Sequence, residues 1–367
     1  MKQPGQEKLE ADRILLIDGA MGTELQRRGV PMDKIAWSGA AVLTHPDVVR
    51  EIHEDYIRAG ARVIITNTFG STRQMLEPAG YGNQVEEVHR GAVRLARQAR
   101  ENAAEPGVAV AGSISTEPPG FDQDAFLDSE KEFEAYREAA GLLLDAGVDL
   151  IALEMIVETS HASRAMQAAR ETGLPVWLGV ACRKAKDGRI VSFDHPDLEL
   201  ITVLDALIPI GPSVVNIMHS EIEAIPRAIE LVRQRWSGPI GVYPESGYFT
   251  KPNWNFVDVI APADLATTAA SWVAAGARLL GGCCGTGPEH IKRIVEVCRD
   301  LTPAPRTPVH EAGATSIYSQ VPFEQDTSFL IIGERTAEEI KMGIGSAAEA
   351  NAKAALRQGT CSDLNLY

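Results

Sequence analysis

The 367-residue chain contains few cysteines, few aromatic residues and no surplus of positive charge. Aromatic residues make up 6% of it, and 35 Lys and Arg residues stand against 50 Asp and Glu residues, for a formal net charge of −15. Nucleic-acid backbones and anionic membrane surfaces attract basic proteins. The acidic balance therefore argues against a nucleic acid or a membrane as partner.

Long apolar runs are also missing from the sequence. No stretch of about 18 apolar residues is present to form a membrane span, and residues 1–12 lack the apolar centre of a signal peptide. We therefore expect a cytoplasmic protein. The chain is 45% hydrophobic, which is typical of a globular protein with a sizeable core.

The five cysteines are Cys182, Cys283, Cys284, Cys298 and Cys361. An odd, small number of cysteines in a chain of this length does not indicate a disulfide framework. Cys283 and Cys284 are adjacent and difficult to join to each other, so two neighbouring thiols remain available for chemistry. We interpret Cys182 and Cys298 as buried filling residues.

Short apolar runs rich in β-branched residues alternate with amphipathic helical stretches. The predicted strands are residues 14–17, 63–66, 108–111, 150–153, 176–180, 213–217, 240–243 and 279–282. Predicted helices include residues 48–59, 85–100, 133–146, 160–171 and 222–236, and several end at a glycine, namely Gly60, Gly147, Gly173 and Gly276. Strands that are apolar on both faces and separated by helices indicate a parallel sheet.

About eight such units in roughly 290 residues favour a (β/α)8 TIM barrel over an open sheet. The first strand leads into Asp-Gly-Ala-Met-Gly-Thr rather than the GxGxxG loop of many open sheets. We assign residues 1–301 to the barrel, residues 302–327 to a proline-rich, polar linker, and residues 328–367 to a short β-α-β extension. In that extension, residues 329–332 and 362–366 are predicted strands and residues 337–357 a predicted helix.

In (β/α)8 barrels, the catalytic and ligand-binding residues lie at the carboxyl ends of the strands. The polar residues at those ends are Asp18, Asn67, Thr68, Glu154, the segment 216–219, Glu245 and the Gly-Gly-Cys-Cys-Gly-Thr run at 281–286. Two adjacent cysteines between glycines can turn toward one ion, and intracellular thiolates most often hold zinc. A zinc ion with three protein ligands keeps one position for a substrate thiol, which then loses its proton near neutral pH.

Residues 14–301 resemble the homocysteine S-methyltransferase family, which includes betaine–homocysteine methyltransferase and the first module of cobalamin-dependent methionine synthase. The resemblance rests on residues 18–25, residues 65–69, the strand ending in Glu154, and residues 281–286. It implies a (β/α)8 fold, a zinc ion held in part by Cys283 and Cys284, and homocysteine as substrate.

The resemblance also implies roles for acidic residues in binding the substrate. Asp18 and Glu154 match positions that hold the amino end of homocysteine, with help from the backbone near Gly19. Asn67 and Thr68 belong to the same rim, where they either contact the substrate or fix the rim by hydrogen bonds to the backbone.

The sequence departs from the family at the third zinc ligand. The family places a cysteine directly after a Val-Asn pair at the end of the sixth strand, whereas Val215 and Asn216 are followed here by Ile217. His219 is the only good ligand within two residues of that position. We therefore predict a zinc site formed by His219, Cys283 and Cys284.

The C-terminal segment carries a second resemblance. Ile-Ile-Gly-Glu-Arg-Thr at 331–336 and Asp-Leu-Asn at 363–365 resemble the opening of the pterin-binding module that follows the homocysteine module in methionine synthase. Ala337 stands where that module usually has asparagine. A folate site cannot be built from this fragment alone, so its role stays open, with dimer contacts among the possibilities.

The leading hypothesis is zinc-dependent methyl transfer to homocysteine, giving methionine. Aromatic residues that could face a cationic small-molecule methyl donor are Trp37, Phe69 and Tyr248, through cation–π attraction or simply as rim packing. Alternatively, the methyl group arrives from a methyl-cobalamin or folate partner protein, or the acceptor is another thiol. A third hypothesis is a non-catalytic subunit that holds metal. A homo-oligomer is possible in each case.

Overall fold

A computed structural model describes residues 13–122, 125, 127–305 and four three-residue strands at 313–315, 320–322, 332–334 and 364–366. The chain divides into two compact units, residues 1–307 and residues 308–367.

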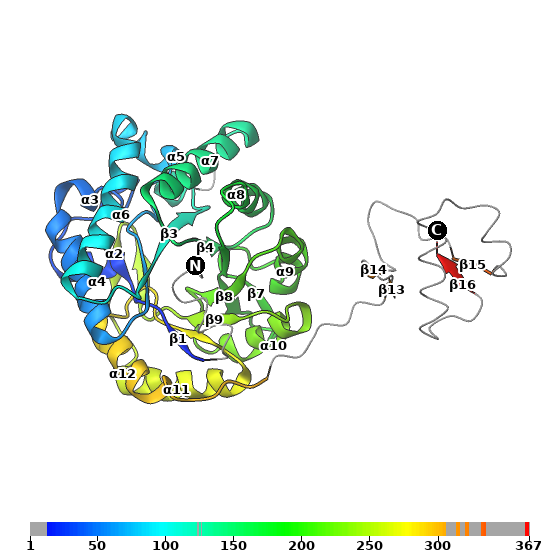
Figure 1. Ribbon diagram of the computed structural model, residues 1–367. Coiled ribbons are helices and arrows are strands. Elements are labelled where there is room, and N and C mark those ends of the chain that lie inside the picture. Colours follow the sequence, from blue (N-terminus) through cyan, green and yellow to red (C-terminus); the bar gives the residue numbers. More distant parts are fainter. Residues whose placement is uncertain are drawn as a thin grey trace. The chain divides into compact units, whose positions relative to one another are not determined.

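The first unit is a barrel of parallel strands (Figure 1). The eight strands are β1 (Leu15–Leu16), β2 (Val63–Ile65), β3 (Ala109–Ser115), β4 (Leu150–Ile156), β5 (Val176–Val180), β8 (Val214–Met218), β9 (Ile240–Tyr243) and β12 (Leu279–Leu280). Their order is β1-β12-β9-β8-β5-β4-β3-β2, and a parallel bridge between Ile17 and Val63 joins the two end strands. The predicted (β/α)8 barrel is confirmed.

Helices surround the sheet (Figure 1). The longer ones are α2 (Met21–Arg27), α4 (Pro46–Ala59), α6 (Val85–Asn102), α7 (Ser129–Ala146), α8 (Ser160–Glu171), α9 (Leu200–Leu207), α10 (Ile225–Arg235), α11 (Pro262–Ala275) and α12 (Pro288–Cys298). Gly60, Gly147 and Gly276 follow α4, α7 and α11 in the left-handed conformation, and Gly173 lies two residues after α8 with a positive φ. These positions confirm the helix ends that the glycines predicted.

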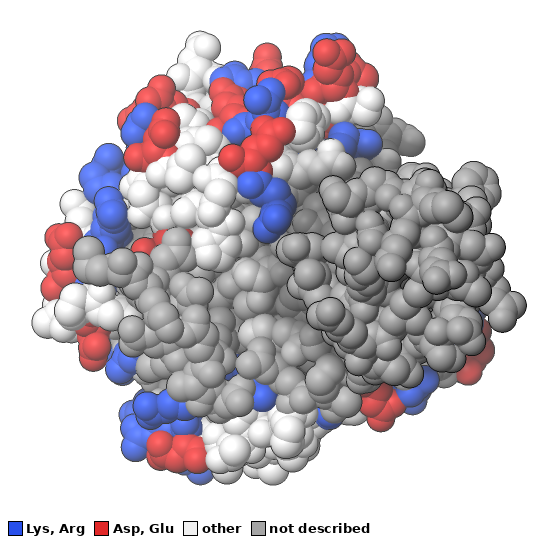
Figure 2. Space-filling view, turned by 45° about the vertical axis from the view of Figure 1, so that its right-hand side comes forward, with Lys and Arg blue, Asp and Glu red and all other residues white. Residues whose placement is uncertain are grey.

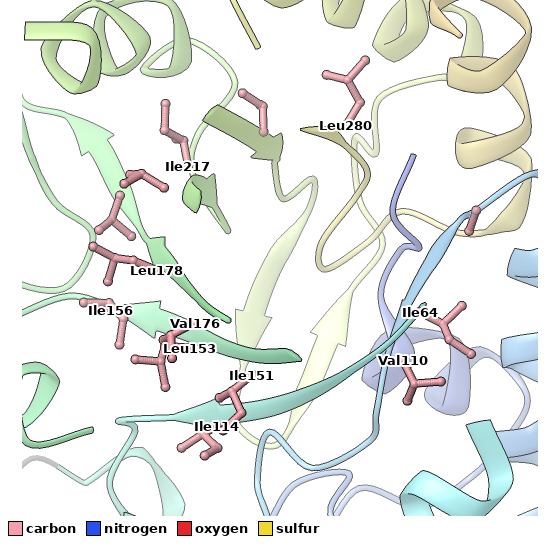
Figure 3. Close-up of a cluster of buried hydrophobic side chains, with 14 of the residues drawn as sticks. Ile64, Val110, Ile114, Ile151, Leu153, Ile156, Val176, Leu178, Ile217 and Leu280 are labelled. Atoms are coloured by element: carbon pink, nitrogen blue, oxygen red, sulfur yellow. The ribbon is translucent and has the colours of Figure 1, made fainter. Parts of the chain in front are cut away.

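Alternation along the strands separates two layers of apolar side chains. Leu15, Ala111 and Trp177 point to the barrel interior, where they belong to one buried cluster. Their neighbours along the strands belong to a second cluster shared with the helices, and Figure 3 shows Ile64, Ile151, Leu178, Ile217 and other members on successive strands. Burying each Leu or Ile contributes roughly 1.5–3 kcal/mol, so the two layers together fix the ring on which the cavity is built.

Two hairpins interrupt the βα pattern and were not predicted from the sequence. β6 (Cys182–Lys184) pairs antiparallel with β7 (Ile190–Ser192) after β5, and β10 (Tyr248–Thr250) pairs antiparallel with β11 (Asn253–Asn255) after β9. Both follow the carboxyl ends of barrel strands. They therefore extend the rim of the barrel at the end where the active sites of such barrels lie.

The outer surface carries charges of both signs. Among the described residues on the face shown in Figure 2, basic and acidic side chains lie interspersed rather than in separate patches. Many form ion pairs along a helix, such as Arg90 with Glu86 and Arg227 with Glu230. Within the described part of the chain, no helix has the length and apolar character needed to cross a bilayer.

The second unit contains four described strands. β13 (Gly313–Thr315) pairs antiparallel with β14 (Gln320–Pro322), and β15 (Ile332–Glu334) pairs antiparallel with β16 (Leu364–Leu366). This pairing differs from the parallel pairing that a β-α-β unit of a barrel would have. The predicted helix at 337–357 and Cys361 lie outside the described residues, so the pterin-module resemblance stays a prediction.

Candidate active site

A cavity of about 500 Å³ opens at the carboxyl ends of the barrel strands. Its lining comes from residues at or just after these ends, including Gly19 after β1, Asn67 after β2, Glu154 in β4, Met218 in β8 and Gly282 after β12. Its walls are mostly apolar and aromatic, with a few polar groups. This is the usual character of a site for a small molecule.

His219, Cys283 and Cys284 meet in this cavity. Their potential ligand atoms all lie within 4.8 Å of one another. His219 Nδ1 lies 3.4 Å from Cys283 Sγ, and His219 Nε2 lies 3.3 Å from a carboxylate oxygen of Glu245. The structure thus brings together the three residues that the sequence proposed as metal ligands.

The backbone around the two cysteines explains why both can serve one site. Gly285 has a φ of +83°, and a Cβ added there would lie 1.7 Å from the carbonyl oxygen of Ser246. The Cys283 amide donates to Pro244 O at 2.8 Å, and the Ser246 amide donates to Cys284 O at 2.9 Å. The cysteine loop therefore runs tightly along the loop after β9, in a turn that only glycine allows.

The electrostatics of this cluster favour an ionised thiol. Hydrogen bonding from Cys284, with help from His219 and against the effect of burial, holds the pKa of Cys283 well below its usual range. Burial lowers the pKa of His219, but the Cys283 thiolate together with the charges of Glu245 and Asp194 outweighs burial and raises that pKa to about 9. Two sulfurs and an imidazole nitrogen are a donor set that zinc accepts readily, and three protein ligands leave a further position for substrate.

Several residues at this site hold backbone conformations that non-glycine residues rarely adopt. Trp37, Met155 and His219 have φ angles of 50°, 56° and 43°, each costing roughly 1–3 kcal/mol. All three line the cavity. Met155 lies where the pairing of β4 with β5 shifts register, directly after Glu154. Such strain is found mostly where a site needs a fixed geometry.

Asp18 and Glu154 are buried close to the cysteines. Asp18 Oδ2 accepts a hydrogen bond from the Ile65 amide at 2.8 Å, whereas Asp18 Oδ1 has no partner among the described residues. Glu154 lines the cavity and accepts a hydrogen bond from Ser113 Oγ at 2.5 Å. Burial raises the pKa of Asp18 well above its usual value and that of Glu154 to about 7. A cation placed beside them would stabilise both carboxylates.

The other predicted substrate-binding residues occupy different places. Gly19 and Asn67 line the cavity, and the Asn67 side chain holds the Ser38 loop through hydrogen bonds of 2.8 and 3.1 Å. Thr68 is not part of the lining. Its hydroxyl donates to Ser113 O at 2.7 Å, which fits the rim-fixing alternative.

The predicted donor-side residues Trp37, Phe69 and Tyr248 all line the cavity. The rings of Trp37 and Phe69 meet edge to face with centroids 6.0 Å apart. Trp37 Nε1 donates to Pro252 O at 3.1 Å, which ties the indole to the β10–β11 hairpin. Tyr248 lies at the rim with 52% of its surface exposed.

Sequence reasoning missed several residues of this cavity. The missed aromatic residues are Phe121, Phe193, Phe249 and Trp254, and the missed acidic residues are Glu117 and Asp194. Glu245 was noted only as a polar residue at a strand end. The only sequence signal for these residues was their position. Each of them lies in a segment that follows a barrel strand or in an inserted hairpin. The sequence alone did not show that these loops turn inward.

Comparisons with known proteins agree with this architecture. Residues 15–298 match the family model described as homocysteine S-methyltransferase. The chain belongs to this family. Homocysteine S-methyltransferase YbgG of Bacillus subtilis is 28% identical over 316 residues, a match that covers 81% of this chain and 98% of that protein. The family confirms the resemblance drawn from the sequence and places this chain among the methyltransferases (EC 2.1.1.-).

Two further relatives show the range of this family. Methionine synthase of Mycobacterium tuberculosis is 27% identical over 349 residues, covering 89% of this chain but only 28% of that protein. The crystal structure of the metallated form of the homocysteine methyltransferase MmuM from Escherichia coli has a TM-score of 0.63 and 29% identity, and the match covers 79% of this chain and 98% of that one. This barrel thus occurs in the family both as a nearly whole protein and as one part of a longer one.

Proposed function

We propose that this protein is a zinc-dependent enzyme that transfers a methyl group to the thiol of homocysteine and forms methionine. The observation that carries the proposal is that His219, Cys283, Cys284 and the carboxylate of Glu154 line one cavity, with a second carboxylate, Asp18, buried within reach of the charges of Glu154 and Cys283. The three metal ligands can hold an ion that binds a thiol, and the two carboxylates can bind an ammonium group. Homocysteine carries both a thiol and an ammonium group.

The donor set of the cluster fits a zinc ion. Two cysteine thiolates would neutralise its double positive charge, and the imidazole of His219 would complete three protein ligands. When bound here, zinc lowers the pKa of a substrate thiol so that the sulfur is a thiolate near neutral pH. The chain's own part is to hold the metal on one side and leave the other side open to the cavity.

Asp18 and Glu154 position the amino acid. The unpartnered Oδ1 of Asp18 and the carboxylate of Glu154 can accept hydrogen bonds from the substrate ammonium. These contacts fix the direction from which the sulfur approaches the methyl group, which is the main contribution an enzyme makes to such a displacement. The backbone near Gly19 and Asn67 completes this side of the cavity.

The methyl donor lies on the aromatic side, near Trp37, Phe69 and Tyr248. In an in-line displacement the sulfur forms a bond to the methyl carbon while the bond from that carbon to the donor atom breaks, and the donor leaves with the electron pair. A donor atom that starts with a positive charge leaves neutral, and aromatic faces stabilise such a cation before transfer. The proton of the homocysteine thiol passes to solvent.

A second source of the methyl group is supported by one comparison. The likeness to methionine synthase, which covers 89% of this chain, favours delivery from a methyl-cobalamin or folate partner protein. In that case the cavity receives the methyl group from a docked protein rather than from a free small molecule. Another thiol acceptor, or a metal-holding subunit without catalysis, would be the remaining outcomes of the test below.

The test measures zinc content and methionine formation together. Purified protein is assayed with homocysteine and each of betaine, S-methylmethionine, S-adenosylmethionine and methyl-cobalamin. We expect about one zinc per chain and turnover with one donor, both lost in His219→Ala, whereas Cys298→Ala at a buried thiol remote from the site keeps both. Zinc without turnover on any donor or thiol contradicts the proposal and favours the metal-holding subunit. A protein without zinc contradicts it entirely.

A further inference from the structure

Among the residues that the structure describes, the cavity is lined by several acidic residues but by no lysine or arginine. Glu117, Glu154, Asp194 and Glu245 belong to its lining, whereas Lys and Arg are absent from it. Glu154 is assigned above to the homocysteine ammonium, and Glu245 pairs with His219. Glu117 and Asp194 are left without a role in that scheme.

Glu117 is the more informative of the two. It follows β3, only 4% of its surface is exposed, and its Oε1 has no hydrogen-bond partner among the described residues. Nearly all buried polar atoms in proteins are hydrogen-bonded, because leaving one unpaired costs roughly 1–3 kcal/mol. An unpartnered carboxylate oxygen at a cavity wall therefore indicates a partner that arrives with a ligand.

Aromatic rings line the cavity to which Glu117 belongs. Phe121, four residues after Glu117, meets Phe249 at a centroid distance of 5.2 Å, and Phe249 meets Trp37 at 6.4 Å. The ring centroid of Trp254 lies 5.7 Å from that of His219. The row of aromatic rings thus leads from Phe121 toward the metal ligands, and Glu117 lies within reach of the charge of His219 in the same cavity.

A carboxylate in a cavity lined by aromatic rings suits one kind of ligand. Aromatic faces attract quaternary ammonium and sulfonium groups, and a carboxylate adds a full negative charge or accepts a hydrogen bond. Above a pH of about 8, where Glu117 is ionised, a ligand that carries its own carboxylate toward Glu117 would meet repulsion from Glu117 and from Asp194, an exposed residue of the cavity lining.

We propose that Glu117 is the anchor for the methyl donor, and that the donor is a methylated onium cation with no carboxylate at the end that reaches Glu117. The proposal rests on the function proposed above, which it makes more specific. The transfer balances in charge and atoms: the onium loses its methyl group and becomes a neutral amine or sulfide, and the homocysteine thiolate becomes a neutral thioether.

The environment of Glu117 supports this assignment. Burial and the charge of Asp194 raise the pKa of Glu117 to about 8, and the opposing charge of His219 is too weak to restore its usual value. The other acidic groups around the cavity, Glu154 and Glu245, also disfavour a further negative charge. An incoming cation favours the ionised form of Glu117, so its binding is expected to displace a proton.

Choline and glycine betaine provide a matched test. Both carry a trimethylammonium group, but choline ends in a hydroxymethyl group where betaine ends in a carboxylate. Binding of each to the full-length, zinc-loaded protein is measured at pH 8.5 without homocysteine, by calorimetry or by fluorescence of Trp37 and Trp254. We expect choline to bind about tenfold more tightly than betaine, or better. Equal binding, or tighter binding of betaine, to the wild-type protein overturns the proposal without any variant.

The isosteric variant Glu117→Gln assigns the preference to one residue. It should lose about tenfold in choline affinity and bring the ratio of the two affinities near one, with zinc content unchanged. The control Glu130→Gln, at an exposed position on α7, should leave both affinities as they are. An unchanged ratio in Glu117→Gln overturns the anchor role.

The outcome can be separated from that of the proposed function because the readout is binding without methyl transfer. If choline binding depends on Glu117 but no donor gives methionine, the proposed function fails and the anchor remains. If methionine forms from betaine or methyl-cobalamin at a rate that Glu117→Gln does not change, the function stands and the anchor is wrong.

Discussion

The imidazole of His219 bridges two groups, with Nδ1 lying 3.4 Å from Cys283 Sγ and Nε2 lying 3.3 Å from a carboxylate oxygen of Glu245. Histidines that bind metals commonly donate their second ring N–H to a carboxylate, which fixes the ring orientation and makes the ligating nitrogen more basic. Glu245 is placed to do this for His219. The site therefore combines a histidine ligand with a residue that positions it.

Replacing this carboxylate tests the positioning role. We expect Glu245→Gln to weaken zinc binding by about 10- to 100-fold, because the amide holds the ring less firmly and polarises it less. Zinc affinity is measured by competition with a chromogenic chelator, which requires no catalysis. Glu223→Gln, at an exposed position nearby in the sequence, is the control and should bind zinc as the wild type does. An unchanged affinity in Glu245→Gln would mean that the carboxylate does not support the ligand.

The pKa of Glu154 predicts how homocysteine binding depends on pH. Burial raises that pKa to about 7, so Glu154 loses its negative charge as the pH falls through 7. Because the protonated acid attracts the substrate ammonium less, the KM for homocysteine should rise below pH 7, and kcat should change less. Kinetics from pH 6 to 8.5 measure this. Glu154→Gln should raise the KM at high pH and remove its rise at low pH.

Ser113 provides a sharper version of the same test. Its hydroxyl donates to Glu154 and lowers the pKa of that carboxyl, against the larger effect of burial. Ser113→Ala should therefore move the rise in KM to higher pH while leaving its shape unchanged. A profile that stays at the wild-type position would show that another group titrates.

The turn after the two cysteines depends on Gly285. A side chain there would need a φ of +83° and would place its Cβ 1.7 Å from Ser246 O, so we expect Gly285→Ala to lose zinc and to lower the melting temperature. Gly29→Ala is the matched control, since Gly29 has a φ of +82° but nothing within 4 Å of an added Cβ. That variant should lose about 1 kcal/mol from backbone strain and keep its zinc. Equal effects in both variants would exclude the clash as the cause.

Much of the fold could be predicted from the sequence because the barrel strands are buried on both faces and read as apolar runs. The prediction of β9 and of α8 agrees with the structure at both ends. Glycines at helix ends added an independent signal. In contrast, the strands of the two rim hairpins have three residues each, which is too short for a periodic pattern.

The site was predictable only in part. Adjacent Cys283 and Cys284 and the carboxylates at strand ends point to chemistry by residue type and position, and His219 was found by looking where a cysteine was missing. Phe249 and Trp254 were not found because they belong to an inserted hairpin. Glu117 was not found because its burial comes from the packing of other loops around it, which no local pattern records.

The central claim, that homocysteine binds through its sulfur to a zinc ion held by His219, Cys283 and Cys284, is tested most directly by zinc K-edge X-ray absorption. The zinc-loaded wild-type protein is measured with and without homocysteine. We predict a first shell with two sulfur atoms in the absence of substrate and three in its presence. A sulfur count that homocysteine leaves unchanged would contradict the account.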